Sequence, residues 1–249
     1  SLQAFFDETR DVRTFSERRW EGSLQFESKR SRTTTVLGRY AFRRVTVDPS
    51  SLKISPEQIP LQSQPVLVGE LGLTWIRDTR VSPANASDGI FNSVDLAVAA
   101  RQLGSQASFT RGLIQSSSYH RIGRRLVFAR STQFGVENPF GSDRMVSVNG
   151  VEVSTNTIPL PERFFAGGGT SHRGFGLNEA GPRDLTTGFA IGGNAVLVNS
   201  LELRFPVWGQ SISGVLFHDA GNVYSSFRSI SFRLHQPNLT DFDYMSHGV

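Results

Sequence analysis

The sequence predicts an all-β protein, an antiparallel transmembrane β-barrel of about nine or ten strands. Three observations predict this fold. Apolar and polar residues alternate with period two along much of the chain. No apolar run approaches the roughly 18 residues of a membrane helix, whereas a barrel strand needs only about 10 residues, half of them polar. Short and long connections also tend to alternate, as they do between the two rims of a membrane barrel.

The composition limits the class of protein without choosing a fold. A length of 249 residues with 38% hydrophobic residues suits one or two ordinary domains or one large barrel. The absence of cysteine excludes disulfides and thiol chemistry, and it fits an oxidising envelope location. The net charge of +4 is spread along the strands, without a basic block interleaved with aromatic residues. Nucleic acid is therefore not an expected partner.

The first half of the chain predicts four strands. The clearest is 20–27, where apolar residues occupy every second position and polar residues the positions between. The runs 33–48, 67–78 and 93–101 alternate in the same way and are separated by connections rich in Pro, Asn and Gly. Each of these strands therefore has one apolar and one polar face.

The second half predicts four more strands and the start of another. The runs 105–119 and 126–137 alternate poorly, but 188–205 and 212–224 are long and regular. A last partial run begins at Phe242. No segment combines a helical period with a convincing cap.

The connection lengths agree with a barrel whose longest loop, 138–187, is extracellular. This placement puts three short connections at the periplasmic rim: 28–32, 120–125 and 206–211. The same parity puts two long connections outside: 49–64 and 225–241. Two others fit less well, because 78–89 is long for a turn and 104–106 is short for a loop.

The loop 138–187 carries the most informative stretch of the chain. Residues 163–176 read Arg-Phe-Phe-Ala-Gly-Gly-Gly-Thr-Ser-His-Arg-Gly-Phe-Gly. Loops longer than about 12–15 residues are usually functional or disordered, and the three phenylalanines here need somewhere to pack. Glycines allow close backbone approach, and Arg173 offers a planar fork of donors that suits carboxylates. The sequence therefore predicts that this loop docks through Arg173.

Two carboxylates on the strands after the loop are the candidate partners of Arg173. Glu202 lies in Ser-Leu-Glu-Leu-Arg-Phe and Asp219 in Leu-Phe-His-Asp-Ala-Gly-Asn, each on the polar side of its strand. Acids that face a partly desolvated lumen need a cation, and charge-assisted hydrogen bonds from Arg173 would hold the loop there. Asn199 is out of phase in the first of these strands and predicts a bulge.

These three motifs, in this order over about 60 residues, resemble the outer-membrane protein 85 superfamily. Its members include β-barrel assembly and translocation proteins of the BamA and TamA type, related to bacterial surface antigen D15. The resemblance implies a sixteen-strand barrel in the bacterial cell outer membrane, preceded by periplasmic POTRA domains. By that count, residues 1–249 form one partial barrel domain, from about the fifth strand to the start of the fourteenth. The POTRA domains and the first and last strands are then expected outside this sequence.

The resemblance also assigns site residues by motif position. It implies that the tip of the long loop folds into the lumen and meets the inner wall of the barrel. The tip is Arg173, Gly174 and Phe175; the loop glycines are Gly167, Gly168 and Gly169; and the wall partners are Glu202, Phe217 and Asp219. His172 departs from the family, which usually has an aliphatic residue there, and His218 is a lesser departure.

The function implied by the resemblance is the insertion, assembly or translocation of other proteins, as a membrane insertase and not an enzyme. The expected partners are outer-membrane lipid and client outer-membrane or secreted proteins, with periplasmic proteins and lipoproteins as further candidates. No cofactor and no metal site is expected. The five histidines show no metal-ligand spacing.

Three alternative functions stay open at this stage. The first is a two-partner secretion transporter of the same superfamily, and the second is a passive porin-like channel. The third is a soluble β-sandwich that binds a partner. Two other interpretations are disfavoured, because the glycine triplet lacks the flanking strand and helix of a phosphate loop, and no sugar cleft accompanies Glu202 and Asp219.

Overall fold

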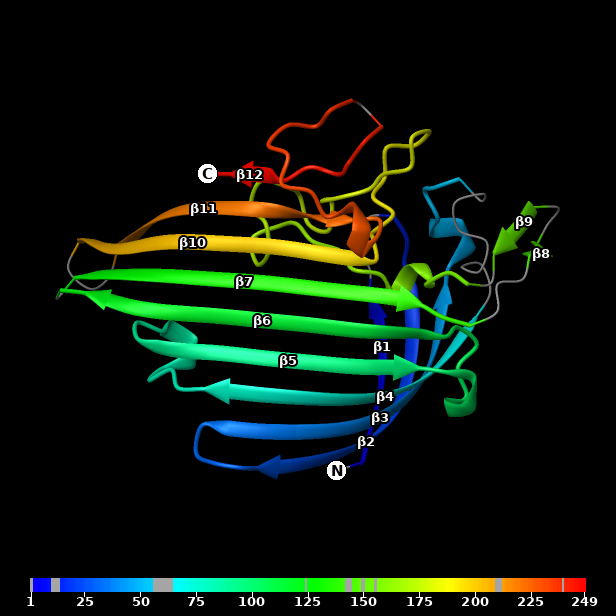
Figure 1. Cartoon of the computed structure of the whole chain (residues 1–249), viewed down its shortest axis with the longest axis horizontal. Helices are drawn as coiled ribbons and strands as arrows, with labels where there is room; N and C mark the ends of the chain where they lie inside the picture. Colours follow the sequence, from blue (N-terminus) through cyan, green and yellow to red (C-terminus); the bar gives the residue numbers. More distant parts are fainter. Residues whose placement is uncertain are drawn as a thin grey trace.

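The computed structural model describes residues 2–9, 14–55, 65–123, 125–141, 145–148, 151–154, 156–208, 212–238 and 240–249. Within these residues the chain forms a ten-stranded antiparallel sheet in the order β1-β2-β3-β4-β5-β6-β7-β10-β11-β12 (Figure 1). A separate two-stranded hairpin, β8-β9, lies in the long loop. The predicted all-β antiparallel class and the strand count are confirmed.

The sheet strands β2 to β7, β10 and β11 are 11 to 14 residues long. The strands are β1 (Leu2–Thr9), β2 (Glu17–Lys29), β3 (Thr34–Val47), β4 (Val66–Asp78), β5 (Gly89–Ala99), β6 (Phe109–Ile122), β7 (Leu126–Pro139), β8 (Met145–Val148), β9 (Val151–Ser154), β10 (Ala195–Trp208), β11 (Ile212–Tyr224) and β12 (Ser246–Gly248). A tilted strand of about 9–11 residues already crosses a bilayer core, so these strands are long enough to span. No helix in the described part of the chain is long and apolar enough to cross a membrane.

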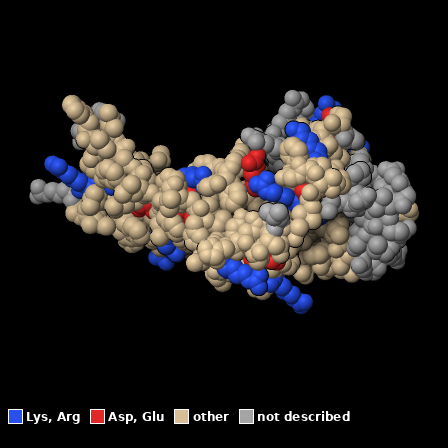
Figure 2. Space-filling model, turned by 90° about the horizontal axis from the view of Figure 1, so that it is seen from above, with Lys and Arg blue, Asp and Glu red and all other residues tan. Residues whose placement is uncertain are grey.

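The outward face of the sheet is exposed and mainly apolar along β2 to β5, and along β6, β7 and β10 it also carries polar residues such as Ser116, Arg130 and Asn199. The inward face carries charged and polar side chains together with the apolar patches that the long loop covers. Large exposed side chains occupy alternate positions along neighbouring strands: Leu24, Phe26, Leu71, Leu73, Leu96, Ile114 and Leu216. Most of the described surface visible from above is neither acidic nor basic (Figure 2). An apolar surface of this extent is costly in water and suits contact with lipid.

The connections separate into two rims. The connections β2–β3, β4–β5, β6–β7 and β10–β11 lie at one end of the sheet, and the long loop leaves β7 at the other (Figure 1). This confirms that 28–32 and 120–125 share a rim opposite the loop 138–187. Residues 209–211 of the connection 206–211, and residues 56–64 of the predicted loop 49–64, lie outside the described residues.

Four predictions about the strands were wrong. β1 was missed because adjacent phenylalanines, Phe5 and Phe6, break its alternation. The strand predicted from 188 begins only at Ala195, since Gly188 and Gly192 take left-handed φ values of 75° and 64°. β6 begins at Phe109 instead of 105, and the run expected from 242 is a strand only over β12.

Two further details differ from expectation. The loop 138–187 was predicted to have no sustained strand pattern, but it contains the four-residue strands of the β8-β9 hairpin. No bulge occurs at Asn199, which pairs in register with Thr132 and Ala220. The Thr132 hydroxyl donates to Asn199 Oδ1 at 2.8 Å, so a polar cross-strand pair accounts for the break in the apolar pattern.

The buried core lies between the long loop and the inner face of the sheet. One cluster packs Ile158 of the loop on β4, β5 and β6, and a second packs Leu160 with Phe15, Val47 and Ile54. A third packs Ala166 and Ala180 of the loop on β10 and β11. The three loop phenylalanines join these clusters: Phe164 and Phe175 the third, and Phe165 the second. The loop is therefore part of the core of the protein.

Candidate functional site

The wall side of the site is a patch on β10 and β11. Ser200 of β10 pairs with Asp219 of β11, and Glu202 pairs with Phe217. Residues directly opposite each other on antiparallel strands share a face, and so do residues two apart on one strand. The four side chains therefore form one continuous patch on the inner face of the sheet.

Arg173 of the loop binds this patch through both its side chain and its backbone. Its Nε donates to Asp219 Oδ2 at 2.8 Å and its Nη2 to Oδ1 at 2.7 Å, which is a bidentate pair. Its backbone N–H donates to the same Oδ2 at 2.9 Å. Nη1 donates to Glu202 Oε1 at 2.8 Å, and Nη2 also donates to Ser200 Oγ at 2.9 Å. Charge-assisted bidentate bonds of this kind are among the strongest hydrogen bonds in proteins.

Three further contacts surround Arg173 and its carboxylate partners. Its guanidinium carbon lies 3.7 Å from the centroid of the Phe217 ring, a cation–π contact. The Ser200 hydroxyl donates to Asp219 Oδ1 at 2.7 Å. Arg204 donates to Glu202 Oε2 from Nε at 2.8 Å and from Nη2 at 2.7 Å. Two arginines thus face two carboxylates, and the site is electrically neutral.

The tip residues Gly174 and Phe175 fit the wall closely. A Cβ on Gly174 would lie 3.1 Å from the His172 ring and 3.3 Å from Gly248 Cα of β12. The Phe175 side chain packs on the third core cluster, and its carbonyl accepts a hydrogen bond from Gly168 at 3.0 Å. A side chain at residue 174 would therefore require the His172 ring or the backbone of β12 to shift.

The glycine triplet is required at two of its three positions. Gly167 has φ 123°, and a Cβ there would lie 2.3 Å from the Gly176 carbonyl oxygen. Gly168 has φ 88° and packs against Leu177. Gly169 has no neighbour within 4 Å of the same position. The first two glycines allow the loop to fold back on itself, whereas the space around Gly169 would accept a side chain.

His172, the departure from the family pattern, is fully buried beneath the tip. Its ring packs edge-on against Phe175 with centroids 5.0 Å apart. The Gly174 N–H donates to Nδ1 at 3.2 Å, which leaves Nε2 to donate to Ser246 Oγ at 3.0 Å. Burial lowers the pKa of His172, so the neutral ring is the favoured form. The histidine links the loop tip to β12.

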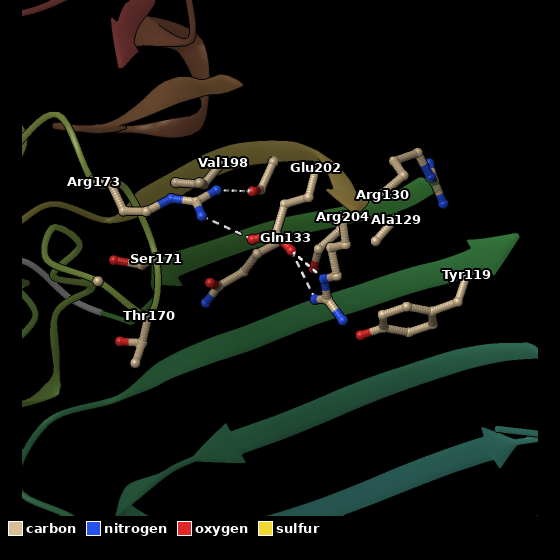
Figure 3. A pocket seen from close by; sticks show the side chains of 13 residues that line it. Tyr119, Ala129, Arg130, Gln133, Thr170, Ser171, Arg173, Val198, Glu202 and Arg204 are labelled. Atoms are coloured by element: carbon tan, nitrogen blue, oxygen red, sulfur yellow. Dashed lines mark hydrogen bonds and ion pairs between the residues drawn. The ribbon is translucent and has the colours of Figure 1, made fainter. Parts of the chain in front are cut away.

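A polar cleft of about 210 Å³ remains between the loop tip and the wall (Figure 3). Its lining includes Tyr119 and Gln133 from the wall and Thr170 and Ser171 from the loop, beside Arg173 and Glu202. Hydroxyl, amide and paired ionic groups of this kind hold water and position the loop. The arrangement can therefore fix a loop against a strand wall.

The predicted tip and wall residues lie at this loop–wall contact, whereas Gly167 and Gly168 pack within the loop and Gly169 makes no close contact. Two contributors were missed, Ser200 and Arg204, although both lie one strand period from Glu202 on the same face. A second cluster near the middle of the loop, around Glu162 and Arg43, was also missed. Its members lie far apart in the chain, so no local pattern could have found it.

The fold and the site define a class of protein: a membrane barrel wall whose inner face binds an arginine-tipped loop. The Omp85 superfamily domain matches residues 1–241. The chain therefore belongs to the Omp85 superfamily, and its place is the bacterial outer membrane.

One solved structure has a similar fold. It is BamA from Haemophilus ducreyi lacking POTRA domains 1–3, with a TM-score of 0.69 and 18% sequence identity. The match covers 97% of this chain and 48% of that one. The chain therefore spans about half the length of the BamA structure.

Proposed function

We propose that the full-length protein inserts or assembles other proteins in the outer membrane. The family assignment and the BamA-like fold support an assembly or translocation protein. The assembly role is the finer proposal, and the contact of Arg173 with Asp219 and Glu202 is the observation that carries it. Client outer-membrane proteins are the proposed substrates, and the membrane lipid is the medium into which they are inserted.

In this proposal the loop keeps the wall in shape while the barrel works on a client. Arg173 holds the tip against β10 and β11 by four side-chain hydrogen bonds. Its two carboxylate partners come from neighbouring strands, so the same contact also fixes the register of β10 on β11. A client strand is then added by edge pairing to a sheet that does not deform.

The test replaces Arg173 with Ala in the full-length protein and measures outer-membrane protein levels in cells depleted of the native copy. Loss of the cation leaves Asp219 buried without its partner, so we expect the loop to detach and assembly to fall at least about tenfold. Arg121→Ala is the control, because Arg121 is an exposed arginine at the end of β6 that binds only the Ser87 hydroxyl among the contacts described. Full complementation by Arg173→Ala would contradict the proposal.

Conductance measurements distinguish an assembly protein from a passive channel. In planar bilayers the native protein should conduct weakly, because the loop and its core clusters fill the concave side of the sheet. Arg173→Ala should raise conductance while assembly falls. High native conductance without any assembly defect in the variant would favour a porin-like channel instead.

A further inference from the structure

The long loop makes a second ionic contact near its middle, directly before the glycine-rich stretch 163–176 and on a different part of the wall. Glu162 ends the short 3-10 helix Leu160–Glu162, 119 residues from Arg43 of β3. Arg43 Nε donates to Glu162 Oε1 at 2.8 Å and Nη2 to Oε2 at 2.5 Å, which is another bidentate pair. Nη2 also donates to Glu70 Oε2 of β4 at 3.0 Å.

Arg111 of β6 binds the same loop residue from a second direction. Its Nη2 donates to the Glu162 carbonyl at 2.6 Å and to the carboxylate Oε2 at 3.3 Å. Its Nε donates to Glu137 of β7 at 2.5 Å. Glu162 therefore joins four wall strands, because Arg43, Glu70, Arg111 and Glu137 come from β3, β4, β6 and β7.

The adjacent Arg163 braces the loop behind this contact. Its Nε donates to the Ile158 carbonyl at 3.1 Å and its Nη1 to the Ile191 carbonyl at 3.2 Å. These carbonyls belong to the outgoing and returning arms of the loop. Arg163 therefore connects the two arms of the loop next to Glu162.

The Arg43–Glu162 pair is less exposed to solvent than the Arg173–Glu202 pair. The side chains of Arg43 and Glu162 are 1% and 3% exposed, against 22% and 20% for Arg173 and Glu202. Burial alone would raise the pKa of Glu162, but the charge and hydrogen bonds of Arg43, with the charge of Arg111, lower it to about 2. Glu162 is therefore a fixed negative charge at neutral pH, and removing it leaves two largely enclosed arginines short of a partner.

The two contacts lie on separate regions of the sheet. The Glu162 contact lies on β3 to β7, and the Arg173 contact lies on β10 and β11, which follow β7 directly in the sheet. The apolar contacts divide in the same way, with Ile158 on β4 to β6 and Ala180 on β10 and β11. The loop thus crosses the concave side of the sheet from one wall to the other.

We propose that Glu162 is a second positioning residue, and that the loop segment 162–173 is a strut held at both ends, by Glu162 on β3 to β7 and by Arg173 on β10 and β11. The strut sets the distance between these walls, and with it the curvature of the sheet. A loop held at two points stays near each site when one contact breaks, because the remaining contact keeps its local concentration high. The functional part of this inference rests on the assembly role proposed above.

The test measures the two ends separately in the full-length protein. The 249 residues contain no cysteine, so single reporters can be placed at the buried positions Ile158→Cys and Ala180→Cys, and their labelling by a maleimide followed. The variants are Glu162→Gln, Arg173→Gln and the double change. Glu27→Gln is the control, since its carboxylate is half-exposed and lies 3.9 Å from Lys29.

We expect each single variant to expose mainly its own end. Glu162→Gln should raise labelling at residue 158 about tenfold or more and change residue 180 little, and Arg173→Gln should do the reverse. The double variant should exceed the product of the two single effects at both positions. Unchanged labelling at residue 158 in Glu162→Gln, or a double variant no worse than Arg173→Gln, would overturn the strut.

A second variant covers the case in which Glu162→Gln fails to fold, as judged by heat-modifiable migration on gels. Glu162→Asp keeps the charge but withdraws the carboxylate by one methylene, so it should raise labelling at residue 158 by a smaller factor. No change in that variant would also overturn the strut. Assembly measured in parallel separates the two proposals: the expected labelling with normal assembly contradicts the assembly role alone, and lost assembly with unchanged labelling contradicts the strut alone.

Discussion

Arg173 uses the whole guanidinium fork, which explains why the position calls for arginine. The four side-chain donors that it engages reach Asp219, Glu202 and Ser200 from one plane, while the flat face of the group lies on Phe217. A lysine offers a single point charge without the planar fork or the stacking surface. Arg173→Lys should therefore keep the charge and lose most of the contact.

His172 makes the loop tip sensitive to pH. Burial holds its pKa below the ordinary value of 6.5, so the unfolded or detached loop takes up a proton before the seated loop does. The stability contributed by the neutral ring is full above about pH 6.5 and is lost as the pH falls from there towards the lowered pKa. The titratable groups that face the ring are Asp219, which raises the pKa of His172, and His247, which lowers it.

We predict that lowering the pH from 7.5 to 5.5 raises maleimide labelling at Ala180→Cys, relative to unfolded protein at the same pH. His172→Leu should remove this dependence, because an aliphatic side chain cannot be protonated. The Glu162 carboxylate itself keeps its charge over this range, since its pKa is about 2 and its contribution is lost only between about pH 4.5 and pH 2. An unchanged pH dependence at Ala180→Cys in the His172→Leu variant would refute this account of His172.

The residues of the tip contact could be predicted from the sequence, and those of the Glu162 contact could not. Arg173, Glu202 and Asp219 stand in ordered motifs on regular strands, where alternation shows which side chains share a face. Glu162 instead meets Arg43, 119 residues away, and only the curvature of the sheet brings them together. Period-two patterns determine the face of a strand but not which distant strand a loop reaches.

At the scale of elements, the long loop behaves as a piece of core. Its apolar side chains bury three clusters against the inner face of the sheet, and Asp184 accepts a hydrogen bond from the Ser55 N–H of a neighbouring loop at 2.6 Å. The length of the loop, its glycines and its phenylalanines predicted the docking. The β8-β9 hairpin escaped prediction because its strands are only four residues long.

The fold of the loop itself depends on Gly167. We predict that Gly167→Ala weakens loop seating by about 1 kcal/mol or more, because alanine resists a φ of 123° and its Cβ would overlap the Gly176 carbonyl. Gly169→Ala is the matched control and should be neutral, since the space around it is open. Labelling at Ala180→Cys measures both variants. An equal effect of the two substitutions would show that the triplet acts only through flexibility.

At the scale of the whole molecule, the protein is a curved sheet with lipid-facing apolar side chains and a loop bound across its polar side. The strands and their rims followed from alternation and connection length, because each strand has one polar face. The start of the strand predicted at residue 188 was wrong, since the chain there has strand-like composition but turns at Gly188 and Gly192. Backbone conformation at glycine is not visible in a hydrophobic pattern.

The most direct test of the loop-to-wall contact is a double-mutant cycle on the full-length protein, with Arg173→Ala and Asp219→Ala alone and together. Loop opening is measured from the protection of Ala180→Cys against labelling. The account predicts that each single variant costs about 3 kcal/mol or more and that the two are coupled by at least about 1 kcal/mol, because each change removes the same contact. Small, additive effects would contradict it, and would show that the loop is held by its apolar clusters alone.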